Sequence, residues 1–365
     1  MKRRLTLIIF LFFTVGCLAA QINVSGIFDS SVSAKVTGGD DPVLSFGIEE
    51  YANLRFQTRV GDNVTIFGAV NLLAAAGDYA SIISPAMGFF AGDNYVAGIE
   101  LERLYFRLRG EHLDFNGGLL RMPFGYGQVF GPSDFLNPRN PTKPDARPRA
   151  VLGAGLSWFH PEEDLKVHGF AAAPRNSSSP GSDGWIAGIS GENHWDKLSV
   201  QALYSFELPK TGSENGIHRA GLSVKADIEA GIYIDTFYAY NHEAGTRHEG
   251  LSFSAGADYS FIDGKLIVIA EYLYNGETSS TYGGELNNNH YLYTGLTWLF
   301  SDYTNVNAAL ISSFDDISFT PIVTLSHDLF QGALLTVTAM LPAAHNEFSG
   351  WGWFFNCSVR LRLRF

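Results

Sequence analysis

The sequence is poor in cysteine and in long apolar runs. Only two cysteines, Cys17 and Cys357, occur among its 365 residues. Beyond the first twenty residues, no segment reaches the ~18 consecutive apolar residues that a membrane-spanning helix requires. No long helical stripe appears, and no repeat longer than a pair of strand-like runs is evident. The chain beyond residue 20 is therefore expected to form no transmembrane helix and, with one cysteine left, no internal disulfide.

Basic residues and catalytic motifs are also scarce. The 25 Lys and Arg against 37 Asp and Glu give a net charge of −12, which disfavours nucleic acid as a partner. The ten histidines are scattered, and the sequence has no serine-centred elbow, metal-ligand pair at helical spacing or phosphate-binding loop. The pair His242 and His248 lies in a break and is expected to be solvated. We therefore predict no enzymatic activity, no cofactor and no metal site.

The first twenty residues have the pattern of a secretory signal peptide. Lys2, Arg3 and Arg4 precede a short apolar run, and small residues follow up to Ala20. We expect cleavage after Ala20, which would leave residues 21–365 as one domain with a net charge of −12 − 3 = −15. An alternative is a lipoprotein acylated at Cys17, although the leucine expected three residues earlier is absent.

Strand-like runs separated by breaks fill the rest of the chain. Aromatic residues are abundant, with 28 Phe, 16 Tyr and 6 Trp. Many runs alternate apolar and polar residues, as in a strand between two different environments. Pro321 lies inside one run and should mark a bulge or a shorter strand. The runs predict eighteen strands, or sixteen if region 304–327 is partly misread, near residues 22–37, 43–60, 64–77, 97–110, 113–122, 150–159, 165–173, 185–195, 198–207, 216–228, 231–242, 249–261, 265–275, 289–300, 304–314, 317–327, 333–341 and 351–365.

The breaks alternate between short and long along the chain. With an even number of strands both termini lie at one end, and every tight turn except Asp315-Asp316 then falls at that same end. Run 249–261 places Leu251 and Phe253 on one face and Ser252 and Ser254 on the other. The difference in length between the breaks at the two ends, together with this alternation, is typical of all-β transmembrane barrels with short periplasmic turns and long outer loops.

The final fifteen residues carry a resemblance to a known group. In Trp351–Phe365, every second residue back from Phe365 is apolar, and the opposite face carries Arg360, Arg362 and Arg364. This strand, ending in an aromatic residue, resembles the last strand of bacterial outer-membrane β-barrel proteins. The resemblance implies insertion in outer-membrane lipid and recognition of Phe365 by the barrel-assembly machinery. Sixteen to eighteen strands enclose an aqueous channel, whereas eight are filled by their own side chains.

The longest break, Pro123 to Arg149, contains six prolines and is the third outer loop. Its position and length resemble the porin constriction loop that folds into the lumen, and Pro132–Pro138 is similar to a motif of substrate-selective porins. Its charged residues carry a net of 4 − 2 = +2, so we predict a selectivity filter. A rigid loop packed on the rim is the alternative. The charged residues are Asp134, Arg139, Lys143, Asp145, Arg147 and Arg149.

Arginines also recur on single faces of predicted strands. A lipid-facing arginine near the bilayer midplane would cost roughly 2–4 kcal/mol, so these side chains should face water. A basic wall would favour anionic solutes, although non-selective porins also carry such a ladder opposite acidic groups. The predicted pore-lining wall residues are Arg55, Arg59, Arg103, Arg107, Arg360 and Arg362, with Arg109 and Arg364 on the same faces.

Together these patterns predict a porin of the cell outer membrane for passive diffusion of small hydrophilic solutes, favouring anions or sugar acids. The first alternative is a fatty-acid-type outer-membrane transporter, for which the sequence offers no plug segment ahead of the first strand. The second is a surface adhesin or structural barrel that binds through its third loop. A homotrimer is left open.

Overall fold

The structure is a computed structural model made of antiparallel β-strands. It describes residues 22–38, 42–77, 80, 87–139, 141, 148–173, 184–208, 216–243, 246–276, 286, 288–342 and 354–365. The strands are β1 (Ile22–Thr37), β2 (Val43–Val60), β3 (Val64–Gly77), β4 (Met87–Gly92), β5 (Tyr95–Arg109), β6 (Leu113–Leu120), β7 (Val151–Phe159), β8 (Leu165–Ala173), β9 (Ile186–Trp195), β10 (Leu198–Glu207), β11 (Ile217–Asp227), β12 (Gly231–Glu243), β13 (Thr246–Phe261), β14 (Leu266–Asn275), β15 (His290–Ser301), β16 (Thr304–Ser313), β17 (Ser318–Phe330), β18 (Ala333–Met340) and β19 (Phe354–Arg364). Within these ranges, no helix is long and apolar enough to cross a membrane.

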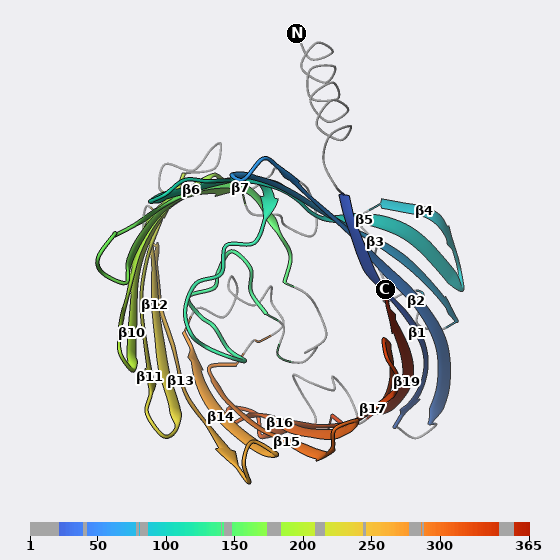
Figure 1. The fold of residues 1–365 in the computed structure, drawn as a ribbon. Coiled ribbons are helices and arrows are strands. Elements are labelled where there is room, and N and C mark those ends of the chain that lie inside the picture. Colours follow the sequence, from blue (N-terminus) through green and yellow to red (C-terminus); the bar gives the residue numbers. More distant parts are fainter. Residues whose placement is uncertain are drawn as a thin grey trace.

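Eighteen of the nineteen strands form one closed ring (Figure 1). Each strand pairs with the next in the sequence, except that β3 pairs with β5 and the short β4 adds only to the free edge of β5. The ring closes where β1 pairs with β19 along eleven residue pairs, from Ile27↔Arg364 to Thr37↔Phe354. The eighteen-strand prediction is confirmed, and sixteen is wrong because region 304–327 contains both β16 and β17.

The two faces of the wall differ as the alternation predicts. On β13, Ser252 and Ser254 face inward and are fully buried, whereas Leu251 faces outward and is 48% exposed. Leu222 on β11 and Val323 on β17 are similarly exposed on the outer face. An apolar outer face and a polar inner face are the arrangement that a transmembrane barrel requires.

One charged side chain departs from this rule. The register of β1 and β2 places Glu50 opposite Ser30 on the outer face, and the Ser30 hydroxyl donates to Glu50 Oε1 at 2.7 Å. The second oxygen, Oε2, is buried without a hydrogen-bond partner. Among the strand residues whose side chains the structure describes, no other Asp, Glu, Lys or Arg faces outward.

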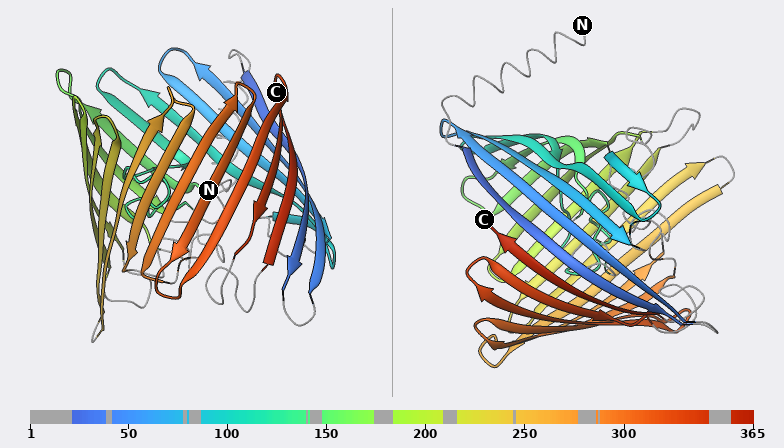
Figure 2. Two further views of the ribbon diagram at one scale, coloured as in Figure 1. Left: turned by 90° about the horizontal axis from the view of Figure 1, so that it is seen from below. Right: turned by 90° about the vertical axis from the view of Figure 1, so that its right-hand side faces the viewer.

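Short turns gather at one end of the tilted strands (Figure 2). Gly61, Gly264 and Gly332 adopt positive φ there, which glycine tolerates without steric cost. At the other end, the connection 314–317 is short as expected. A second short one exists because β12 runs to Glu243 and β13 starts at Thr246, beyond the predicted strand ends.

Pro321 does not mark a bulge. It pairs with Leu310 in the continuous β16–β17 register, and its carbonyl accepts from Leu341 N at 3.1 Å on the β18 side. Its missing N–H therefore also faces β18, where the strand ends at Met340. The irregularity of β17 lies elsewhere, between Asp328 and Phe330.

Candidate functional site: an inward loop between two charged walls

The segment after β6 leaves the wall and runs inside the barrel (Figure 1). Within Arg121–Ala150, the structure describes residues 121–139, 141 and 148–150. Phe130, Ser133 and Asn137 of this segment are almost fully buried. The prediction that the third outer loop folds into the lumen is therefore confirmed.

Side chains of β10 and β12 bind the backbone of this loop. The amide of Gly125 donates to Gln201 Oε1 at 2.7 Å. The amides of Tyr126 and Gly127 donate to the Asp235 carboxylate at 2.9 and 2.7 Å. A Cβ at residue 127 would lie 1.9 Å from the Phe130 carbonyl oxygen, so glycine is required for this approach.

Glu271 on β14 binds the next three amides. Gln128 N and Val129 N donate to Oε2 at 3.1 and 2.9 Å, and Phe130 N donates to Oε1 at 2.9 Å. The Tyr233 hydroxyl on β12 also donates to Oε2 at 2.9 Å. Six consecutive backbone donors of the loop, from residue 125 to 130, are thus satisfied by three side chains of the wall.

Apolar contacts fix the same loop from its other faces. Met122, Phe124 and Leu136 belong to a buried cluster with wall residues such as Phe170. Farther along the ring, Phe130 packs in a second cluster with Leu273, Leu286 and Tyr291. Burying one such side chain contributes roughly 1.5–3 kcal/mol. The loop is therefore held at both ends of its path across the lumen.

Asp134 and Asn137 organise the loop from within. Asn137 Oδ1 accepts from Met122 N at 2.6 Å, and its amide group donates to the Arg149 carbonyl at 2.6 Å. The Asp134 carboxyl accepts weakly from Phe124 N at 3.4 Å. Burial raises the pKa of Asp134 to about 8, although the charge of Arg139 opposes this shift.

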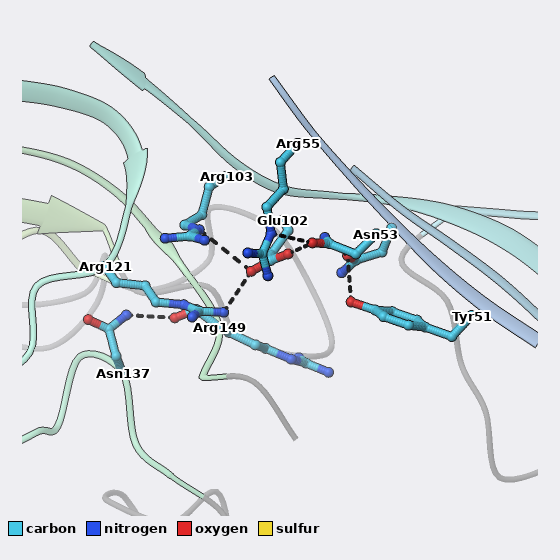
Figure 3. Close-up of polar contacts among 9 residues, drawn as sticks. Tyr51, Asn53, Arg55, Glu102, Arg103, Arg121, Asn137 and Arg149 are labelled. Atoms are coloured by element: carbon cyan, nitrogen blue, oxygen red, sulfur yellow. Dashed lines mark hydrogen bonds and ion pairs between the residues drawn. The ribbon is translucent and has the colours of Figure 1, made fainter. Parts of the chain in front are cut away.

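The opposite wall, from β2 to β6, carries a basic cluster (Figure 3). Glu102 on β5 is its central acid: it accepts from Asn53 Nδ2 at 2.6 Å and from Arg121 at 2.9 Å, and Arg103 Nε lies 3.5 Å away. Arg55 Nε donates to Asn53 Oδ1 at 2.6 Å. Figure 3 shows the Arg149 side chain entering the same region from the loop. We call Arg55, Arg103, Arg121 and Arg149 the arginine cluster; with Glu102 its formal charge is 4 − 1 = +3.

The remaining predicted site residues are distributed more widely. Arg107 pairs with Asp114 on β6. Arg362 makes a bidentate pair with Asp29 across the closing seam, with both distances 2.7 Å. Arg360 shares the inner face of β19, and Arg59 is exposed near the end of β2.

The predicted loop residues divide into three groups. Arg139 is exposed and donates to the Gln128 carbonyl at 2.7 Å. Asp134 is buried inside the loop rather than facing open lumen. Lys143, Asp145 and Arg147 lie outside the described residues.

Four acidic side chains of the inner face lie on the wall opposite the arginine cluster. Glu192, Asp235, Asp258 and Glu271 lie on β9, β12, β13 and β14. The loop uses them: besides the backbone contacts above, Tyr126 donates its hydroxyl to Glu192 at 3.1 Å, and Gln128 its side-chain amide to Asp258 at 2.6 Å. No group of three or more His, Cys, Asp or Glu in the described chain is arranged to hold a metal.

Three solved structures with the same fold come from two bacteria. Acinetobacter baumannii OccAB4 superposes with a TM-score of 0.61 at 11% identity, covering 94% of this chain and 98% of that chain. OccAB1 of the same species gives 0.63 at 10% identity, covering 94% and 96%. Pseudomonas aeruginosa OccK7 (OpdD) gives 0.60 at 12% identity, covering 95% and 99%. No protein-family model and no curated protein sequence matches the chain.

Proposed function

We propose that the protein is an outer-membrane porin through which small hydrophilic solutes diffuse down their gradient. The observation that carries this proposal is a closed ring of eighteen strands with an inward loop docked on one side of its lumen. A ring of this size encloses more space than its own side chains can fill. The loop narrows that space, and the apolar outer face suits lipid.

We further propose that the channel favours anions, including sugar acids. The arginine cluster brings four guanidiniums together, and Glu102 forms ion pairs with two of them, those of Arg121 and Arg103. The acidic wall opposite is largely covered by the loop, whose backbone donors bind the carboxylates of Asp235 and Glu271 and leave both residues fully buried. Arginine forms charge-assisted hydrogen bonds with carboxylates, often two at once. An anion in the remaining lumen would therefore meet more positive than negative charge.

Single-channel recording in a planar bilayer under a salt gradient tests both parts. The wild-type protein should conduct, and its reversal potential should show anion preference. Arg55→Gln combined with Arg103→Gln should shift the reversal potential toward cation preference. Arg109→Gln is the matched control because its side chain is 64% exposed and lies outside the cluster. Absence of conductance would contradict the porin proposal, and cation preference unchanged by the double substitution would contradict the selectivity.

The cellular proposals have separate tests. If the protein lies in the outer membrane, it should fractionate with that membrane after removal of residues 1–20. Recognition by the assembly machinery predicts that deletion of Phe365, whose backbone pairs with Gly26 at 2.8 and 3.1 Å, slows barrel formation in cells. A homotrimer stays a prediction, which cross-linking in native membranes would test.

A further inference from the structure

Glu102 occupies a β-bulge. Ala69 on β3 pairs with Arg103, whereas the next residue, Val70, pairs with Leu101. Glu102 is therefore the extra residue of β5, and its side chain joins Arg103 on the inner side of the wall (Figure 3). Strict alternation would have turned one of these two neighbours toward lipid.

The bulge brings one carboxylate into contact with much of the arginine cluster. Glu102 is 7% exposed. Its two oxygens bind Arg121 at 2.9 Å and Asn53 at 2.6 Å, and Arg103 forms an ion pair at 3.5 Å. Asn53 in turn accepts from Arg55. Three of the four guanidiniums are thus linked to Glu102 directly or through one amide.

Arginines gathered in this way repel one another. The guanidinium stays charged at any working pH, and each long side chain has many alternative rotamers. A buried counter-charge offsets the repulsion and selects one arrangement. Without it, the guanidiniums are expected to move apart into the lumen, where water solvates them separately.

We propose that Glu102 is a positioning residue, which holds Arg55, Arg103 and Arg121 close enough for one solute carboxylate to meet more than one guanidinium. This inference rests on the proposed anion preference. It assigns a negatively charged residue a favourable role in anion binding. This is the opposite of what the charge of Glu102 alone would predict. If Glu102 acted only through its charge, its removal would strengthen anion binding; if it acts by positioning, its removal weakens that binding.

The experiment compares Glu102→Gln with wild-type protein in planar bilayers, with block of the chloride current by sodium malonate as the measurement. The substitution keeps the side-chain size and removes the charge. We expect the concentration for half-block to rise by at least about threefold, corresponding to the loss of one modest hydrogen bond. Asp114→Asn is the matched control, since it neutralises a carboxylate that pairs with Arg107 outside the cluster. The control should leave malonate block unchanged or strengthen it.

Equal or tighter block in Glu102→Gln would overturn the positioning role. Heat-modifiable migration on gels would confirm that both variants fold as barrels. If wild-type protein shows neither anion preference nor malonate block, the proposed selectivity fails by itself. A crystal structure of Glu102→Gln then decides the positioning claim: separated guanidiniums support it, and unchanged positions of Arg103 and Arg121 refute it.

Discussion

Glu271 is expected to be the main polar anchor of the inward loop. Replacement by alanine removes an acceptor of four hydrogen bonds, three from loop amides and one from the Tyr233 hydroxyl. At about 0.5–1.5 kcal/mol net for each of the three bonds from loop amides, docking of the loop should weaken by about 1.5–4.5 kcal/mol. Burial of the neighbouring Phe130 contributes roughly 1.5–3 kcal/mol. The lost bonds are therefore comparable to the apolar contact that remains.

Hydrogen exchange measures this loss directly. Amides of residues 128–130, which donate to Glu271, should exchange faster in Glu271→Ala than in wild-type protein, while amides of β13 keep their protection. Glu271→Gln should give an intermediate result, because the amide oxygen still accepts but the NH2 group faces backbone donors. Asp258→Ala is the control, since Asp258 binds the Gln128 side chain rather than the backbone. Unchanged protection of residues 128–130 in Glu271→Ala would refute the carboxylate anchor.

Three further predictions concern individual side chains. Arg362→Ala should lower the free energy of unfolding by about 1–3 kcal/mol in urea titrations, because it leaves Asp29 buried without its bidentate partner; equal stability would count against a role in closure. Burial raises the pKa of Asp134 from 3.8 to about 8 in the docked loop. The docked loop therefore keeps this carboxyl protonated at pH values where the undocked loop would lose the proton, and docking should lose stability as pH rises from about 4 to about 8. Single-channel current noise should therefore increase over that range in wild-type protein and not in Asp134→Asn, and an equal increase in both would contradict this assignment. Glu50→Leu should raise stability by about 1 kcal/mol, because it removes a carboxylate from the lipid-facing side; a loss of stability would indicate that this face contacts protein instead.

The strands could be predicted because their signals are local. Alternation along β11, for example, is set by neighbouring residues, and turn residues such as Gly61 mark strand ends without reference to distant parts of the chain. The short β4 was missed because six residues inside a long break carry too little alternation to stand out. The bulge at Glu102 was also missed. One extra residue changes which residues of β5 face inward, but the alternation before and after the bulge stays regular.

The contacts of the site could not be predicted, because they depend on distant segments. Gly127 and Asp235 are 108 residues apart, and nothing in either neighbourhood indicates the other. Alternation predicted Arg55 and Arg103 on the inner face. It could not indicate that Arg121, which follows the end of β6, completes the same cluster.

The inward loop would allow an acidic protein to present the basic passage that we propose. Its backbone donors are directed to Asp235 and Glu271, so the loop lies against the acidic wall and buries these two carboxylates. In the arginine cluster on the facing wall, Glu102 forms ion pairs with Arg103 and Arg121. A net charge of −12 for the whole chain is thus compatible with a positive potential at the constriction. The position of the loop, and not the overall charge, is therefore expected to determine which solutes pass.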